Sequence, residues 1–589
     1  MLRGKLIVKG SSHSLVRPAP SAFQRRAATP CRQSRRHTEP NLCGSWAGRP
    51  LTAVQLQSSR SSRRQGRQRL LTQDCGILGI FKHQGDASAE IYEGLLMLQH
   101  RGQDSAGMVT TDGERFREHK DNGLVREVFQ KQRTLSNLAG SSGIGHVRYP
   151  TAGSLTAQEA QPFFVNSPLG IYLIHNGNLT NPEPLRARLS SSQSYFSRHL
   201  RTESDSEVLL NIWADEIHRA HQRYQSSGGT DPGAKKADFV LEAGEAMMKL
   251  LEGAYSCISL VKDVGLVAFR DPHGIRPLVL GKRHSRHGDE WCVASEDCAF
   301  GPIGFERVRD VQPGEMIIID KNGQLTSRQC ARGGWVCPCI FEYIYLARPD
   351  SVLNNISVYN FQLGLGTRLA RRILDTQWKI DCVVPVPDGS RPAAIQISAV
   401  LGLPYREGLV KNRYVGRTFI MPDQRIRELS VRRKLNAMPT VFAGKNVLLV
   451  DDSIVRGTTM RQIVGMVRKA GAKKVYLASA SPPVRWPNVY GVDMPTRKEF
   501  VACDLDENQI CQVLGADGLL YQTLEDLLSV GQELNPAVRN FEASCFTGKY
   551  ITAGVDSDYL AGLENSVRQV ARSQTSKSEA LAPGTAGTI

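Results

Sequence analysis

Several features that would point to other classes of protein are missing from this sequence. Its thirteen cysteines include no Cys-x-x-Cys pair, so neither a zinc ribbon nor a disulfide framework is indicated, and a reducing compartment fits best. No run of 18 apolar residues occurs, so we predict no membrane span. Acidic residues are nearly absent from residues 1–74, although the body of the chain has its ordinary share of them.

This basic leader, residues 1–74, accounts for most of the net charge. Thirteen Arg and two Lys stand there against one Glu and one Asp, a net +13, whereas the whole chain carries +17. Only +4 remains for residues 75–589, which gives no electrostatic case for nucleic-acid binding. The leader is rich in Arg and Ser and has no apolar period, so we predict that it is disordered. Its composition is typical of a transit peptide, or of upstream sequence attached by a mistaken start site.

The clearest motif is NVLLVDDSIVRGTT, at residues 446–459. Val447 to Val450 form a short apolar run, which is typical of a strand buried on both faces. Asp451 and Asp452 follow, and small or hydroxylated residues then lead into a helical pattern. Such a loop presents backbone N–H groups and the positive end of a helix dipole to a phosphate. The sequence therefore predicts strand, phosphate loop and helix, with the Asp pair holding ribose hydroxyls directly or through Mg²⁺.

These residues resemble the phosphoribosylpyrophosphate (PRPP) signature of type I phosphoribosyltransferases. Strand-end Asp pairs also occur in response regulators and other doubly wound folds, but that alternative does not explain the Arg-Gly-Thr-Thr that follows. A second strand, loop and helix at residues 383–402 resembles the pyrophosphate loop of the same family. Relatives often place a hydroxyl directly after the Asp, whereas this chain has Gly389 followed by Ser390. Either Ser390 contacts Mg²⁺, or water and backbone oxygens do; the sequence leaves both open.

A basic, glycine-hinged segment, LVKNRYVGRTF, lies between these two motifs. It resembles the flexible loop that closes over PRPP in the family, and the alternative is a solvated charged loop. The resemblance implies PRPP contacts at Asp388, Gly389, Ser390, Lys411, Arg413, Asp451, Asp452, Ser453, Arg456, Gly457, Thr458 and Thr459, and a Mg²⁺ site at Asp451, Asp452 and Ser390.

The segments CGILGIF, LQHRGQDSAGM, GIGHVRYPTAG, LIHNGNLTN and TESDSE follow one another from Cys75 onward. Together they resemble class II glutamine amidotransferases, the N-terminal-nucleophile family. The resemblance implies that the thiolate of Cys75 attacks the glutamine amide and that the α-amine of the same residue is the general base. It assigns the oxyanion hole to the Asn176 side chain and the Gly177 N–H. It assigns the glutamine clamp to Arg148 and Asp205, assisted by Thr151.

Each of these residues also has an ordinary explanation. A cysteine in an apolar segment is usually a core residue, Arg148 could be a surface cation, and Asn176-Gly177 is a common hairpin turn. The ordered set across about 130 residues favours the functional interpretation. Asp74 precedes Cys75, so the leader must be removed, or never made, before Cys75 has a free amine. If the leader stays attached, glutamine hydrolysis should fail.

Over essentially all of residues 75–560 the chain resembles glutamine phosphoribosylpyrophosphate amidotransferases. The resemblance implies an α+β N-terminal-nucleophile αββα sandwich followed by an α/β phosphoribosyltransferase domain with a parallel sheet. The implied reaction converts glutamine, PRPP and water to 5-phosphoribosylamine, glutamate and pyrophosphate, the first committed step of purine synthesis, with ammonia passed between two sites. The expected parts are the leader 1–74, a glutamine amidotransferase domain 75–310, a linker 311–340, a phosphoribosyltransferase domain 341–510, a C-terminal helical segment 511–571 and a disordered tail 572–589.

The resemblance also implies Mg²⁺, a homotetramer and inhibition by purine nucleotides, with no nucleic-acid or membrane partner. Some relatives carry an iron–sulfur cluster on four cysteines that include a C-terminal Cys-x-x-Cys. Here Cys503, Cys511 and Cys545 are widely spaced, so we predict no cluster.

Two other functions compete with this prediction. Hexosamine-phosphate synthases and asparagine synthetases share the amidotransferase domain, but the PRPP loop argues against both. A regulatory PRPP- or nucleotide-binding protein without glutaminase activity is the alternative if Cys75 is never exposed as the N-terminus. We expect a cytoplasmic protein, because nothing around Gln73 and Asp74 resembles a cleavage site; a genuine transit peptide would instead imply an organelle.

Overall fold

The computed structural model describes residues 75–149, 157–191, 194, 197–226, 236–412, 435–494 and 496–565. All of these belong to one compact unit, Gln65–Ile589. The predicted leader, the predicted tail and the predicted site residues Thr151 and Arg413 lie outside the described residues. No helix in the described ranges has both the length and the apolar character needed to cross a bilayer.

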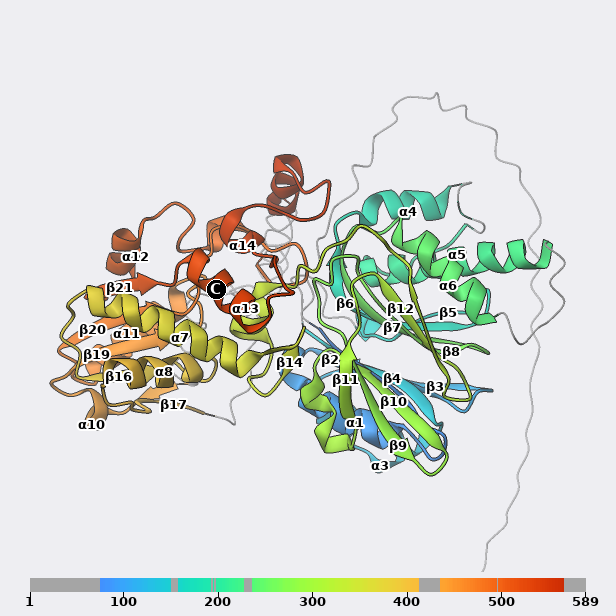
Figure 1. Cartoon of the computed structure of the whole chain (residues 1–589), viewed down its shortest axis with the longest axis horizontal. Coiled ribbons are helices and arrows are strands. Elements are labelled where there is room, and N and C mark those ends of the chain that lie inside the picture. The colour runs from blue at the N-terminus through green and yellow to red at the C-terminus, as the bar shows by residue number, and fades with distance from the viewer. Residues whose placement is uncertain are drawn as a thin grey trace, which may run out of the picture. The chain divides into compact units, whose positions relative to one another are not determined.

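The N-terminal half contains two antiparallel sheets packed face to face (Figure 1). The first consists of β1 (Cys75–Phe81), β2 (Ser105–Thr111), β3 (Phe116–Asn122), β4 (Ser142–Arg148), β9 (Val279–Ser285), β10 (Gly288–Ala294) and β11 (Glu306–Asp310). The second consists of β5 (Phe163–Val165), β6 (Ile171–Leu179), β7 (Gly253–Val261), β8 (Gly265–Arg270), β12 (Glu315–Ile319) and β13 (Leu325–Gln329). Their strand orders are β11-β9-β10-β1-β4-β2-β3 and β13-β12-β8-β7-β6-β5.

Alternation along β1 shows how the layers are held together. Ile77 and Phe81 lie in the core between the sheets, whereas Leu78 and Ile80 face the opposite side, toward the helix layer. The helices of this half are α1 (Ser88–Met97), α2 (Val125–Val128), α3 (Gln132–Asn137), α4 (Pro182–Ser190), α5 (Asp205–Ser226) and α6 (Lys236–Met248). Helix α1 packs on the first sheet, and α5 and α6 share a core with the second. The predicted αββα sandwich is confirmed.

The C-terminal half is built on a parallel sheet, as predicted. Strands β16 (Cys382–Pro385), β19 (Asn446–Asp451), β20 (Lys474–Ser479) and β21 (Gly518–Tyr521) pair in that order. Two hairpins, β14 (Val352–Leu353) with β15 (Ile356–Ser357) and β17 (Leu409–Lys411) with β18 (Leu435–Ala437), accompany it. The helices are α7 (Val358–Asp375), α8 (Arg391–Leu401), α10 (Pro439–Phe442), α11 (Thr458–Lys469), α12 (Glu507–Leu514), α13 (Leu524–Leu534) and α14 (Ser544–Thr547).

Two of the expected boundaries stay predictions, and the strand pairing supports different ones. The predicted linker, 311–340, contributes β12 and β13 to the second sheet of the sandwich, so we propose that the first domain runs to Gln329. The predicted C-terminal segment, 511–571, begins inside α12 and supplies β21, the fourth strand of the parallel sheet. Both differences have one cause: a local pattern cannot show which remote segment a strand pairs with, and here β12 pairs with β8 and β21 pairs with β20.

A buried ionic network joins the two halves. Arg101 pairs with Glu296 and, at 2.6 Å, with Glu342, and Arg276 lies 2.9 Å from Glu342. All four side chains are at most 2% exposed. Burial opposes ionisation of Glu296, but the charges of Arg101 and His100 outweigh it and hold its pKa below the usual range. Removing one member would leave an uncompensated buried charge, so the network fixes the two halves against each other.

Candidate active sites

The predicted nucleophile lies in the middle of the first sheet. Cys75 opens β1, which is flanked by β10 on one side and β4 on the other. In the β1–β4 register Cys75 stands opposite Arg148, and both residues are fully buried. The antiparallel pairing therefore places the predicted nucleophile beside one arm of the predicted glutamine clamp.

Two carboxylates that sequence reasoning missed hold Arg148. Its guanidinium lies 2.5 Å from Glu159 and 3.5 Å from Asp104. Burial raises the pKa of Asp104, and the charge of Arg148 opposes that effect. Because a buried cation requires a partner, these carboxylates explain why Arg148 can be buried here rather than lie on the surface. Asp104 lies in the RGQDSAG segment, so the sequence motif includes this residue but does not predict that it pairs with Arg148.

The predicted oxyanion-hole residues occupy the interior of strand β6, so the hairpin-turn alternative for Asn176-Gly177 is wrong. Asn176 is fully buried, and its Nδ2 lies 3.5 Å from Oγ of Ser295. Gly177 has φ 148°, and a Cβ built on it would lie 2.1 Å from the carbonyl oxygen of Ala254. Only glycine fits at this position.

The second clamp residue, Asp205, begins helix α5 and lies at the end of β6, the strand that contains Asn176 and Gly177. Its Oδ2 accepts a hydrogen bond of 2.9 Å from the backbone N–H of Leu179. The next residue, Ser206, is 2.9 Å from Nδ1 of His175, a buried residue that the sequence analysis did not select. Burial lowers the pKa of His175, so the ring is neutral at physiological pH. The fold thus brings the described members of the predicted glutaminase site together around β1 and β6.

The predicted PRPP motif has the expected form of strand, loop and helix. Strand β19 ends at Asp451, and α11 starts at Thr458 after Gly457, which has φ 71°. Burial raises the pKa of Asp452 to about 6, and burial together with the neighbouring Asp452 raises the pKa of Asp451 well above its usual range. Burial opposes the ionisation of both carboxyls, and a cation bound beside them would favour their charged forms.

The parallel pairing of β16 and β19 brings the second predicted loop against the first. A Cβ built on Gly389 would lie 2.2 Å from Oδ2 of Asp452, so the glycine allows the two loops to touch. Ser390 is buried, and its hydroxyl donates to the carbonyl of Val386 at 2.6 Å. That hydrogen bond orders the loop; a contact between Ser390 and Mg²⁺ stays a prediction.

The cations of this site are paired with carboxylates of the chain. Lys411 Nζ lies 2.8 Å from Asp388, and Arg456 lies 2.7 Å from Glu499. Arg391, which the sequence analysis did not select, also pairs with Asp388, at 2.7 Å. These side chains are between 38% and 51% exposed, so water and ligands reach them. Ser453 donates to Asp452 at 3.0 Å, and Thr458 and Thr459 form the first turn of α11.

Comparison with known proteins decides the family. A phosphoribosyl transferase domain model matches residues 363–493, and a glutamine amidotransferase domain model matches residues 146–301. The amidophosphoribosyltransferase of Escherichia coli (strain K12) is 51% identical over 495 residues, which cover 83% of this chain and 95% of the relative. That of Saccharomyces cerevisiae is 45% identical over 511 residues, 85% of this chain and 97% of the relative. The chain belongs to the amidophosphoribosyltransferase family.

Solved structures agree with this membership. The glutamine PRPP amidotransferase from B. subtilis, complexed with ADP and GMP, has 39% sequence identity and a TM-score of 0.70, covering 82% of this chain and 98% of that one. A second structure, of "the allosteric regulatory enzyme of purine biosynthesis", has 39% identity and a TM-score of 0.71, covering 82% and 97%. Membership of the amidophosphoribosyltransferase family makes the chain a glycosyltransferase with glutamine amidotransferase activity, acting at the first step of purine biosynthesis.

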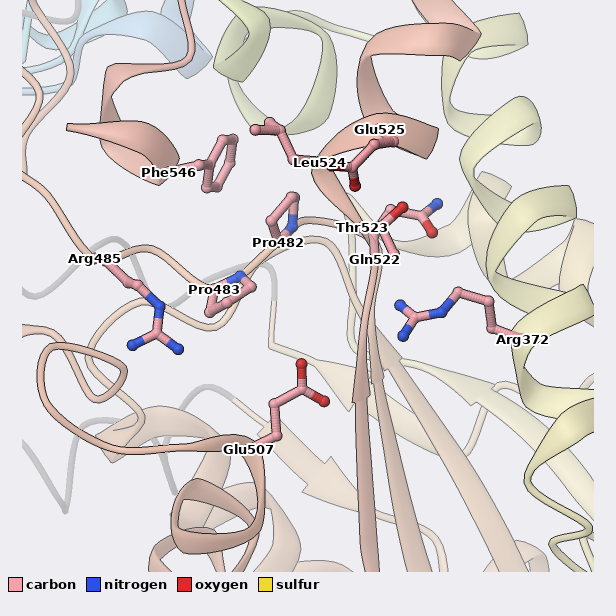
Figure 2. A pocket seen from close by; sticks show the side chains of 10 residues that line it. All are labelled: Arg372, Pro482, Pro483, Arg485, Glu507, Gln522, Thr523, Leu524, Glu525 and Phe546. Carbon is pink, nitrogen blue, oxygen red and sulfur yellow. The ribbon is translucent and has the colours of Figure 1, made fainter. Parts of the chain in front are cut away.

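A separate cavity of about 270 Å³ opens in the phosphoribosyltransferase half. Figure 2 shows Arg372 and Arg485 on opposite sides of it, with Glu507 between them. Arg372 donates to the carbonyl of Tyr521, and Arg485 donates to the carbonyl of Ala502 at 2.6 Å. None of the predicted PRPP-binding residues lines this cavity, so it is not the site that the motifs of the amidophosphoribosyltransferase family indicate.

Cys545 is one of the three C-terminal cysteines on which the prediction of no iron–sulfur cluster rests. Cys545 and Cys339 are both buried near Glu542; burial first, and then that carboxylate, raise the pKa of each thiol well above its usual range. Cys511 lies apart, in α12. The part of the chain that the structure describes brings no three His, Cys, Asp or Glu side chains together as a metal-holding group. The absence of an iron–sulfur cluster stays a prediction.

Proposed function

We propose that this amidophosphoribosyltransferase converts glutamine, PRPP and water to 5-phosphoribosylamine, glutamate and pyrophosphate. The observation that carries the proposal is that one compact unit contains the residues of both predicted centres. One surrounds Cys75 in the sandwich, and the other lies where β19 meets the N-terminus of α11. Each has the residue types that its half of the reaction requires.

At the first centre, the thiolate of Cys75 attacks the side-chain carbonyl carbon of glutamine. The free α-amine of Cys75 takes the thiol proton and returns it to the leaving nitrogen, so ammonia departs and a thioester remains for water to hydrolyse. Nδ2 of Asn176 and the N–H of Gly177 donate to the oxygen on which negative charge develops. Donors placed in advance for that charge lower the barrier because they need no reorganisation.

The glutamine itself is held by its α-groups. Asp205 receives the α-ammonium, and Arg148 receives the α-carboxylate, with Thr151 assisting. Glu159 and Asp104 already neutralise Arg148 in the substrate-free chain, so glutamine binding replaces part of that pairing. The exchange favours a ligand that brings its own carboxylate.

At the second centre, ammonia attacks C1 of the ribose as pyrophosphate leaves. The N-terminus of α11 and the loop Ser453, Arg456, Gly457, Thr458 and Thr459 hold the 5-phosphate. Asp388, Gly389 and Ser390 form the loop beside the pyrophosphate. Lys411 and Arg413 neutralise the departing charge.

Magnesium fits this second centre. Asp451 and Asp452 are hard oxygen donors whose charges repel each other, and they are the residues that would hold the ion. Bound there, Mg²⁺ would neutralise phosphate charge and so make pyrophosphate a better leaving group. The chain supplies two carboxylates, which leaves the remaining coordination positions to substrate oxygens and water.

Ammonia released in water would be protonated at neutral pH and lose its nucleophilicity, so we propose that it passes between the centres through a closed route. The buried network of Arg101, Glu296 and Glu342 supports a fixed arrangement of the two halves. We also propose a homotetramer and feedback inhibition by purine nucleotides; the ADP and GMP in the B. subtilis relative support the latter.

Glutamate release from glutamine and phosphoribosylamine formation from PRPP test the proposal on chain that begins at Cys75. We expect both activities in that protein, and loss of glutamate release when residues 1–74 are retained. Glutamate release without phosphoribosylamine would refute the transferase assignment. If neither activity is found while PRPP still binds, the regulatory alternative replaces the proposal.

A further inference from the structure

Ser295 follows β10 directly and is tied to the strand that carries Cys75. Its N–H donates to the carbonyl of Ile77 at 3.0 Å, and its Oγ accepts from the N–H of Ile77 at 3.1 Å. The side chain is fully buried. Ser295 thus extends the β1–β10 pairing by one residue and holds its hydroxyl in a fixed position two residues from the predicted nucleophile.

The same hydroxyl contacts the carboxamide of Asn176. Nδ2 of Asn176 lies 3.5 Å from Ser295 Oγ, at the outer limit of a hydrogen bond. Oδ1 of Asn176 is buried and has no hydrogen-bond partner among the residues that the structure describes. In this orientation the amide directs its donor at an oxygen that already accepts from Ile77, and leaves its acceptor unsatisfied.

A half-turn of the carboxamide lets Oδ1 accept from Ser295 and moves Nδ2 to the position that has no partner among the described residues, because the oxygen and nitrogen of an Asn side chain have nearly the same shape. The Ser295 hydroxyl has one proton, and its oxygen already accepts from a backbone N–H. That proton can be donated to Oδ1 of Asn176. Nδ2, with two N–H bonds, then faces away from Ser295 and is available to a substrate oxygen.

We propose that Ser295 is a positioning residue of the glutaminase centre. Its hydroxyl donates to Oδ1 of Asn176 and so sets which edge of the carboxamide faces the developing oxyanion. The inference rests on the proposed function of Asn176 and adds the residue that orients it. Ser295 does not touch the substrate in this proposal; it acts through Asn176.

The backbone around Ser295 suits that task. Its neighbour Glu296 is fully buried and forms ion pairs with Arg101 and, at 2.7 Å, with His100. On the other side, β10 is paired with β1 as far as Ala294. Ser295 is therefore fixed from both directions, and its hydroxyl can select one amide orientation without moving itself.

The test is Ser295→Ala in chain that begins at Cys75. We expect the glutamine-dependent kcat to fall about tenfold or more, but by less than the roughly 10²- to 10³-fold lost with an oxyanion donor itself. The KM for glutamine should stay within about twofold, because Ser295 contributes nothing to ground-state binding. Ser295→Thr keeps the hydroxyl and should recover most of kcat. Phosphoribosylamine formation from added ammonia should be unchanged in both variants, which shows that the fold is intact.

A double-mutant cycle separates positioning from general support. If Ser295 acts through Asn176, then Asn176→Ala combined with Ser295→Ala should be no slower than Asn176→Ala alone. Ser259→Ala is the matched control, since Ser259 is equally buried and donates to the carbonyl of Tyr172 at 2.8 Å. It should leave kcat within about twofold. An unchanged kcat in Ser295→Ala, or additive effects in the double variant, would overturn the proposal. Absence of glutaminase activity in the unmodified protein would instead refute the proposed function.

Discussion

At the glutaminase centre Arg148, Asn176 and Asp205 are at most 5% exposed, whereas Asp388 and Lys411 of the phosphoribosyl centre are about half exposed, at 51% and 47%. The first group is tied to strands and helices by hydrogen bonds and buried ion pairs. The second has buried residues, Ser390 and Asp452, but its cations form surface ion pairs, which contribute little stability and can be exchanged at small cost. The difference follows the substrates: a centre that stabilises one developing charge needs fixed dipoles, and a centre that takes a polyanion needs cations that can change partners.

The largest effect on the reaction rate should come from a substitution at the glutaminase centre. Cys75→Ala removes the only nucleophile proposed for glutamine, so we expect the glutamine-dependent rate to fall by roughly 10³-fold or more. Phosphoribosylamine formation from added ammonia should remain, because the second centre keeps all its residues. Rate measurements with each nitrogen source separate the two. A parallel loss with both sources would show that the centres are not chemically independent.

Ligand binding at the phosphoribosyl centre should depend on pH. Burial raises the pKa of Asp452 to about 6, so its carboxylate takes up a proton as pH falls through 6. A protonated carboxyl is a poor ligand for a divalent cation, so the apparent affinity for Mg²⁺ and PRPP should fall about tenfold between pH 7 and pH 5. Titration of the ammonia-dependent rate with Mg²⁺ at several pH values measures this. Equal Mg²⁺ affinity at pH 5 and pH 7 would contradict it.

A single added carbon atom can disrupt the contact between the two phosphate loops, which Gly389 and Asp452 make. Gly389→Ala places a Cβ 2.2 Å from Oδ2 of Asp452, and the carboxylate must move. We expect kcat/KM for PRPP to fall about fivefold, the equivalent of about 1 kcal/mol. Gly465→Ala is the control: Gly465 lies within α11 with nothing in reach of a Cβ. That control should leave activity unchanged and stabilise the helix by about 0.5–1 kcal/mol. Equal kinetics in both variants would show that the loops adjust freely.

The same Asp452 should affect stability with a definite sign. Its folded-state pKa lies above the ordinary value of 3.8, so ionisation destabilises the folded state progressively as pH rises from about 4 to about 6, and the full effect is present above about 6. Asp452→Asn should therefore stabilise the substrate-free protein at pH 8 by about 1 kcal/mol, and the advantage should vanish below pH 4. Unfolding midpoints at the two pH values measure it. A variant less stable at pH 8 would mean that the carboxylate makes favourable contacts when ionised.

The local sequence pattern predicts the structure correctly where one continuous segment forms a complete strand, loop and helix. The apolar run before Asp451 and the helical spacing after Thr459 predicted the strand, loop and helix that the structure contains. It failed where partners are remote. The local pattern predicts a linker over residues 311–340, whereas β12 of that segment pairs with β8, and the Asn176-Gly177 dipeptide, a common turn, lies within a strand.

The sequence by itself determined the family and the two chemistries and led to the predicted site residues, because motif residues recur in order and each motif is a continuous stretch. Only the tertiary structure decided what those residues touch. Three contacts join segments that are separated in sequence. Glu159 lies on Arg148, 11 residues away, and Asp452 lies against Gly389, 63 residues away. Ser295 lies on Asn176, 119 residues away. The physical reason is that burial and hydrogen-bond geometry, which set charge and orientation, exist only after the sheets have assembled.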